Sequence, residues 1–182
     1  MLGKPKIGID IDGCIAYMLG DILAEANKRF GIEIKQEEVV RFNLVDNGLT
    51  RPQVEEIIYD WDVIENLPEM PFAREAIEVL WEDHEIHVVS ARKHDSTKPT
   101  KLWLQRHEIK HDVLALHHSD KGKYVDDKNL VWFIEDRYKN AIEISEHCHV
   151  FMFDKPYNDR ELNGNITRIH SWQEILGIIY ED

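Results

Sequence analysis

Short runs of apolar residues, each followed by polar residues, recur along most of the chain. Five of these runs are rich in β-branched and aromatic side chains. They lie at residues 6–9, 85–89, 113–116, 130–134 and 149–153. Runs of this length are typical of strands and are too short for a buried helix. The pattern therefore predicts five β-strands.

Amphipathic stretches separate these runs beyond about residue 70. Apolar residues recur at helical spacing within residues 74–81, 99–107 and 139–146. Alternating strands and helices are typical of units in which helices cover a parallel sheet. We therefore predict an α/β fold with a Rossmann-like parallel sheet.

The interval from about residue 14 to 71 breaks this alternation, because it shows helical patterns without a strong strand. A helix is predicted from Tyr17 to Phe30, ending at Gly31, and another near Pro52, which a first helical turn accepts. We interpret this interval as a small helical cap inserted after the first strand of a single domain covering residues 1–182. Ligands of parallel sheets bind at the carboxyl ends of strands, so such a cap would lie over a binding site.

The composition of the chain limits the binding partners and the cellular compartment that we expect for it. The chain has 182 residues, of which 43% are hydrophobic, enough for one domain with a sizeable core. Its net charge of −13 would repel a nucleic-acid backbone or an anionic membrane surface, so neither is expected as a partner. Asp10 and Asp12 interrupt the start of the chain before a signal-peptide core could form, and Cys14 and Cys148 suit a reducing compartment. We expect a cytoplasmic protein.

Polar side chains follow four of the predicted strands. They are Asp10 and Asp12 after the first, Ser90 and Arg92 after the second, Lys121 after the third, and Glu135 and Asp136 after the fourth. Two carboxylates two residues apart can divide the work of nucleophile and proton carrier, and Asp136 would add an oxygen ligand for magnesium. Ser90 and Lys121 could hold a phosphate oxygen, whereas Arg92 is either a clamp on phosphate or a surface charge.

This order of segments resembles the haloacid dehalogenase superfamily of phosphohydrolases. The resemblance rests on Asp10-Ile11-Asp12-Gly13, the run ending in Ser90, the lysine, and the run ending in Glu135-Asp136. Within the superfamily the chain is similar to the cytosolic 5′(3′)-deoxyribonucleotidase group and to related bacterial nucleotidases. Three segments carry this likeness: residues 90–92, residues 133–136 with Asn140, and residues 153–158.

The resemblance implies a strand order of 3-2-1-4-5 and a role for each motif residue. Asp10 would be the nucleophile that forms an aspartyl-phosphate, and Asp12 the general acid and base. Ser90 and Lys121 would bind the substrate phosphate. Mg²⁺ would be held by Asp10, by the backbone carbonyl of Asp12 and by Asp136.

Three positions need separate interpretation. Glu135 stands where many members of the group carry Asp, which affects the surroundings of the metal rather than its ligands. Lys121 is preferred over Lys123 as the phosphate-binding lysine, because a turn ending near residue 120 would place it at a helix N-terminus. Asn140 is either an exposed helix residue or a residue that orients Lys121.

Two other classes of protein compete with a phosphatase. A phosphoacceptor signalling module would carry its acceptor after the third strand, where this chain has His117 and His118. A scaffold that only binds phosphorylated ligands would be expected to lack one carboxylate of the first motif, yet both are present. We therefore expect a magnesium-dependent phosphomonoesterase whose substrate is a nucleoside monophosphate or another small phosphorylated metabolite.

Four of the aromatic residues in the predicted cap are candidates for contact with a substrate: Tyr17, Phe42, Tyr59 and Trp61. Each could stack on a nucleobase or simply pack inside the cap. The histidines do not predict a zinc site, since residues 147–149 would alternate between the two faces of a strand.

Overall fold

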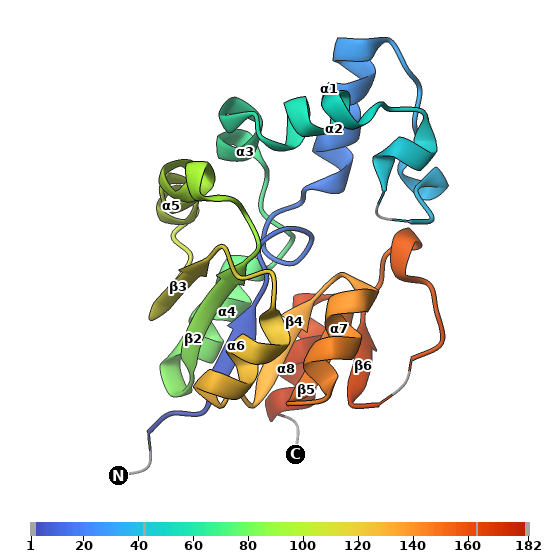
Figure 1. Ribbon diagram of the computed structural model, residues 1–182. Coiled ribbons are helices and arrows are strands. Elements are labelled where there is room, and N and C mark those ends of the chain that lie inside the picture. Colours follow the sequence, from blue (N-terminus) through green and yellow to red (C-terminus); the bar gives the residue numbers. More distant parts are fainter. Residues whose placement is uncertain (1–2, 42, 163, 181–182) are drawn as a thin grey trace.

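The computed structural model of the protein, described for residues 3–41, 43–162 and 164–180, contains a six-stranded parallel sheet (Figure 1). Its order is β3-β2-β1-β4-β5-β6. The strands are β1 (Lys6–Ile9), β2 (Glu85–Ser90), β3 (Val113–Leu116), β4 (Trp132–Glu135), β5 (His149–Phe153) and β6 (Ile166–Ile169). The predicted α/β class and the order of the first five strands are confirmed.

The sixth strand was not predicted from the sequence. β6 lies at the edge of the sheet and pairs only with β5 among the described strands. Its sequence places Thr167 and Arg168 between two isoleucines, and three of its four residues are partly exposed. An edge strand needs no continuous apolar run, so the signal that marked the other strands is missing.

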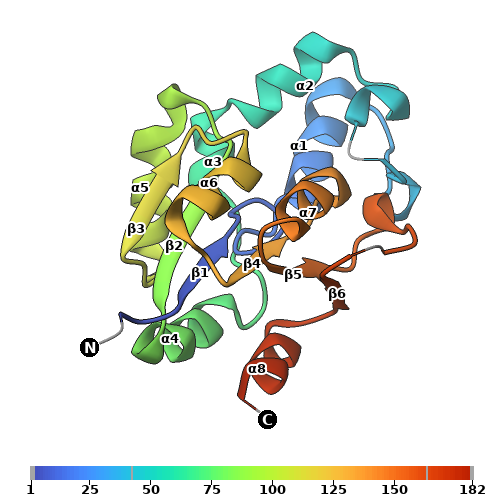
Figure 2. The ribbon, with the colours of Figure 1, turned by 60° about the horizontal axis from the view of Figure 1, so that its bottom comes forward.

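Helices cover both faces of the sheet. They are α4 (Ala73–Asp83), α5 (Thr97–Arg106), α6 (Lys121–Lys128), α7 (Tyr138–Ser145) and α8 (Trp172–Tyr180). In Figure 2, α4 and α8 lie together on one face, whereas α6 and α7 lie on the other. Each face has its own buried core: Ile7 and Ile9 pack with α4 and α8, and Phe133 packs with α6 and α7. The ring of Phe133 lies over Gly8, where a Cβ atom would collide with it.

The chain between β1 and α4 forms a helical layer beyond the carboxyl edge of the sheet (Figure 1). Its elements are α1 (Leu19–Phe30), η1 (Gln36–Glu38), η2 (Leu44–Asn47), α2 (Arg51–Ile58) and α3 (Trp61–Asn66). Gly31 ends α1 with φ 64°, as predicted, and Pro52 lies in the first turn of α2. This layer has a third apolar core, built around Ile22, Leu23 and Ile57. It is called the helical layer below.

Across the described residues, no helix combines the length and the apolar character that a bilayer crossing requires.

Candidate active site

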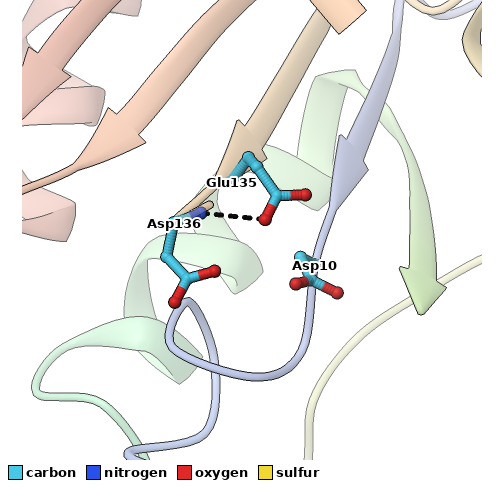
Figure 3. Close-up of side chains that lie close together, drawn as sticks. All are labelled: Asp10, Glu135 and Asp136. Carbon is cyan, nitrogen blue, oxygen red and sulfur yellow. Dashed lines mark hydrogen bonds between the residues drawn. The ribbon is translucent and has the colours of Figure 1, made fainter. Parts of the chain in front are cut away.

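Three buried carboxylates meet where β1 and β4 end. Asp10, Glu135 and Asp136 each place one oxygen within 4.8 Å of the others (Figure 3). The backbone N–H of Asp10 donates to the carbonyl of Ile134 at 3.0 Å, which holds the end of β1 against β4. Oε1 of Glu135 accepts hydrogen bonds from the backbone N–H groups of Asp136 and Arg137, both at 3.1 Å. Strand pairing therefore sets the positions of all three carboxylates.

Lys121 is the cation of this cluster. Its Nζ lies 2.9 Å from Oδ1 of Asp10 and 2.6 Å from Oε2 of Glu135, and its side chain is 2% exposed. The helix α6 begins at this residue, with Asp120 as its cap. Lys123 instead forms an exposed ion pair with Asp127. The structure thus brings Lys121 into the cluster and leaves Lys123 outside it.

Asn140 contacts the cluster through a carboxylate rather than through the lysine. Its Nδ2 donates to Oε2 of Glu135 at 3.2 Å, the same oxygen that Lys121 contacts. Asn140 therefore helps to orient Glu135, and Glu135 in turn holds the lysine.

Burial and mutual repulsion shift the protonation of the three carboxylates. Burial raises the pKa of Asp10 to about 7, although Lys121 partly offsets it. Burial, together with the charges of Glu135 and Asp10, raises the pKa of Asp136 well above its usual value. Burial acts in the same direction on Glu135, but Lys121 and its hydrogen bonds lower the pKa of that residue. One lysine is therefore too little positive charge for three ionised carboxylates.

This donor set fits a hard divalent cation. Oδ1 of Asp136 is buried and has no hydrogen-bond partner among the described residues, while Oδ2 accepts from the hydroxyl of Tyr157. Oxygen donors with excess negative charge are the ligands that Mg²⁺ prefers. Gly13 has φ 86°, and a Cβ atom there would collide with the carboxylate of Asp136. Only glycine lets the loop after β1 pass so close to this group.

Asp12 lies apart from the three carboxylates and is held by Arg92. Nε and Nη2 of Arg92 donate to Oδ2 and Oδ1 of Asp12 at 3.0 and 2.5 Å, and Nη1 donates to Thr100 at 3.1 Å. The side chain of Arg92 is 7% exposed, so it is not a solvated surface charge. The backbone N–H of Arg92 also donates to Oγ of Ser90 at 3.2 Å. Asp12, Ser90 and Arg92 thus form one hydrogen-bonded group across the ends of β1 and β2.

Two residues that support these groups were not assigned such roles from the sequence. His117, at φ 70°, places Nδ1 2.7 Å from the carbonyl of Arg92 and so fixes the loop that carries this arginine. Tyr157 lies within residues 153–158, one of the segments that resemble the deoxyribonucleotidase group. Its hydrogen bond to Asp136 joins residues 21 positions apart in the sequence. No local pattern marks such a pair, because only the fold brings the two segments together.

A cavity of about 220 Å³ opens over these groups. Its polar wall consists of Asp10, Asp12, Ser90, Arg92, Lys121, Asp136, Arg137 and Asn140. The opposite side is lined by Met18, which precedes α1, and by Ile58 and Tyr59 at the end of α2. The cavity therefore gathers every predicted catalytic and phosphate-binding residue at one opening, with Glu135 buried beneath it.

A smaller cavity of about 40 Å³ continues from this one into the helical layer. Apolar side chains such as Ile22, Ile57 and Leu67 line it, and Tyr59 lines both cavities. Lys93 lies 3.9 Å above the ring centre of Tyr59.

The other predicted aromatic residues lie elsewhere. Tyr17 donates from its hydroxyl to Gln36 at 2.8 Å, and Trp61 lines neither cavity. Phe42 lies outside the described residues. Tyr59 is thus the predicted aromatic residue that faces the site.

Comparison with known proteins gives concordant results in sequence and in structure. Residues 4–181 match the family described as 5′ nucleotidase, deoxy (pyrimidine), cytosolic type C protein. The chain is 30% identical to the nucleotidase CA_C3379 of Clostridium acetobutylicum over 185 residues, covering 96% of this chain and 93% of that protein. It is 28% identical to YqfW of Bacillus subtilis, covering 94% and 91% of the two chains.

Solved structures show the same fold at low sequence identity. A predicted phosphatase from Clostridium acetobutylicum aligns over the whole of both chains with a TM-score of 0.71 and 11% identity. The haloacid dehalogenase-like hydrolase SP0104 of Streptococcus pneumoniae gives a TM-score of 0.66 and 13% identity, covering 98% of this chain and 100% of that one.

Proposed function

Because the chain belongs to the cytosolic type C 5′ nucleotidase family of the haloacid dehalogenase superfamily, we propose that it hydrolyses (deoxy)nucleoside 5′-monophosphates with Mg²⁺. Membership of this family makes it a phosphoric monoester hydrolase. One observation carries the proposal. Three buried carboxylates cluster with a single lysine, which contacts Asp10 and Glu135, beside a cavity that the helical layer partly lines. Such a site has too much negative charge to accept a phosphate dianion without a cation.

Asp10 acts as the nucleophile. An oxygen of its carboxylate attacks phosphorus, and the bond from phosphorus to the ester oxygen breaks, leaving an aspartyl-phosphate. Lys121, 2.9 Å from Oδ1 of Asp10, orients this carboxylate and balances part of the charge. Mg²⁺, held by Asp10, Asp136 and the backbone carbonyl of Asp12, would offset repulsion between the nucleophile and the phosphate. Glu135 fixes Lys121 from below.

Asp12 carries the proton in both steps. It protonates the leaving ester oxygen and then takes a proton from the water that hydrolyses the aspartyl-phosphate. Arg92 holds both oxygens of the Asp12 carboxylate in the structure, the ionised form that the second step needs. An incoming phosphate competes for Arg92 and frees Asp12 to carry a proton. Ser90 donates its hydroxyl to a phosphoryl oxygen.

The helical layer selects the leaving group. We take residues 14–71 as a cap of one domain that spans the chain, since its apolar cavity adjoins the phosphate site. Tyr59 offers a ring at the junction of the two cavities, where a nucleobase could stack. The family name and this small apolar cavity make deoxypyrimidine nucleotides the first substrates to test.

A phosphate-release screen tests the proposal. Nucleoside monophosphates, sugar phosphates and p-nitrophenyl phosphate are compared with Mg²⁺ and with a chelator. We expect the highest kcat/KM for a nucleotide and loss of turnover in the chelator and in Asp10→Asn. A sugar phosphate that exceeds every nucleotide would overturn the substrate class, and a single turnover without release would overturn the hydrolase mechanism.

A further inference from the structure

A second polar pocket lies beside the catalytic one and carries the opposite charge. It measures about 190 Å³, and its described lining residues are Arg41, Arg137, Tyr138, Lys139, Tyr157 and Arg160. Four of these six are cations, and none is a carboxylate. The whole chain has a net charge of −13, so this concentration of positive charge stands out from its surroundings.

The cations come from two parts of the fold. Arg41 lies between η1 and η2 of the helical layer, whereas Arg137 and Lys139 lie at the start of α7. Arg160 follows η4 (Pro156–Asn158), and η1 and η4 are in contact. In Figure 1 the part of the helical layer that carries η1 and η2 lies next to the segment around η4. The pocket therefore spans the junction between the helical layer and the sheet.

Two of these cations, Arg41 and Arg160, form no ion pair with a carboxylate of the described residues. Arg160 lies over the ring of Tyr138 at 5.2 Å, and Lys139 approaches Glu143 at 3.7 Å while remaining 85% exposed. Cations gathered in this way repel one another unless an anion lies between them.

The backbone of α7 adds to the attraction for an anion. Arg137 is the N-cap residue of this eight-residue helix, and its side chain makes no capping hydrogen bond. The first N–H groups of a helix need acceptors, and the helix dipole favours negative charge at this end. Guanidinium groups match the geometry of phosphoryl oxygens and bind them by paired hydrogen bonds. Helix and side chains thus favour the same ligand chemistry.

We propose that Arg41, Arg137, Lys139 and Arg160 form a binding site for a phosphoryl group, separate from the catalytic phosphate site. A bound phosphoryl group bridges the helical layer and the sheet. Arg137 also lines the catalytic cavity, and Tyr157 in the pocket wall bonds to Asp136, so the two sites are in contact. The phosphoryl group belongs either to a substrate that carries two of them or to a separate phosphorylated molecule.

Binding of inorganic phosphate tests the site without relying on catalysis. Equilibrium dialysis of radiolabelled phosphate with Mg²⁺ counts the sites on the wild-type chain and on the double variant Arg41→Gln/Arg160→Gln. We expect two sites in the wild type, and at least about tenfold weaker binding at one of them in the variant, because two charge-assisted contacts are lost. Lys28→Gln/Lys123→Gln removes one exposed cation from the helical layer and one from α6, and it should leave both sites intact.

The catalytic pocket supplies the complementary control. Ser90→Ala should weaken the other site and spare the one that Arg41 and Arg160 form. A wild-type chain with only one site, abolished by Ser90→Ala, would overturn the proposal. So would two sites that the double arginine variant leaves unchanged. Failure of the proposed nucleotidase activity would leave these binding results unaffected.

Kinetics then distinguishes the two sources of the phosphoryl group. If the substrate supplies it, a nucleoside 3′,5′-bisphosphate shows a higher kcat/KM than the 5′-monophosphate, and the double arginine variant removes that preference. If a separate molecule supplies it, methylenediphosphonate at constant free Mg²⁺ changes the KM for p-nitrophenyl phosphate in the wild type but not in the variant.

Discussion

Replacing Asp10 by asparagine should stabilise the metal-free protein while it abolishes turnover. Asparagine keeps the shape of the side chain and can still accept a hydrogen bond from Lys121, but it removes one of three buried negative charges. Loss of the nucleophile should lower kcat by several orders of magnitude. The gain in stability is the more specific expectation, because it follows from the geometry of the cluster.

The magnitude follows from the pKa of Asp10, which burial raises from 3.8 to about 7. The folded state then binds the proton more tightly than the unfolded state, so stability falls as the pH rises from about 4 to about 7. Each unit of pKa shift corresponds to about 1.4 kcal/mol. Above about pH 7, ionised Asp10 therefore lowers the free energy of unfolding by about 4 kcal/mol. The variant should recover this free energy at pH 8, or roughly 10 °C in Tm for a chain of this size. At pH 5 the gain should shrink to less than half of this, because most of the window between the two pKa values lies above pH 5.

Denaturant unfolding at pH 5 and pH 8, with a chelator and with Mg²⁺, measures these quantities. Mg²⁺ should stabilise the wild type more than the variant, because the metal relieves the repulsion that asparagine has already removed. Asp127→Asn, which removes an exposed carboxylate paired with Lys123, should leave stability nearly unchanged, because solvent screens this ion pair. A variant no more stable than the wild type at pH 8 without metal would refute the assignment of Asp10 as a strained, buried charge.

Four further outcomes are expected. Asp136→Ala should weaken Mg²⁺ binding in calorimetry more than it lowers the stability of the metal-free protein, and unchanged affinity would contradict its role as a ligand. Tyr157→Phe removes the hydroxyl that holds Asp136 and should weaken Mg²⁺ binding by about fivefold to tenfold, on the scale of about 1 kcal/mol for one hydrogen bond; an equal affinity would show that the bond does not position the carboxylate. Tyr59→Ala should cost ~1 to 3 kcal/mol in kcat/KM for nucleotides but little for p-nitrophenyl phosphate, and equal losses would indicate damaged packing instead of lost stacking. Arg92→Met should lower kcat, because Asp12 loses the two hydrogen bonds that orient its carboxylate, whereas a raised KM with an unchanged kcat would assign the arginine to phosphate binding alone.

Local sequence was sufficient to predict most of the sheet and the edge at which the candidate site lies. Buried strands of a parallel sheet need apolar side chains on both faces, so β1, β2, β4 and β5 stand out as apolar runs. Parallel strands share one carboxyl edge, so the polar residues after them had to converge there. The same reasoning predicted the end of α1 at Gly31, whose φ of 64° few other residues adopt at low cost.

Tertiary structure decided which of the converging side chains touch. Arg92 and Asp12 are 80 residues apart, and Tyr157 and Asp136 are 21 apart, so neither pair leaves a local pattern. The sequence favoured Lys121 over Lys123 only through its expected place at a helix N-terminus, and the helical turn of α6 directs Lys121 to Asp10 and Lys123 to Asp127 at the surface. β6 and the cationic pocket beside Tyr157 were likewise set by packing, because an edge strand and a surface junction impose no periodic apolar constraint. The local sequence determines the spacing of apolar residues in each helix or strand and the chemistry of its side chains. Contacts between distant elements depend instead on how their buried faces pack together.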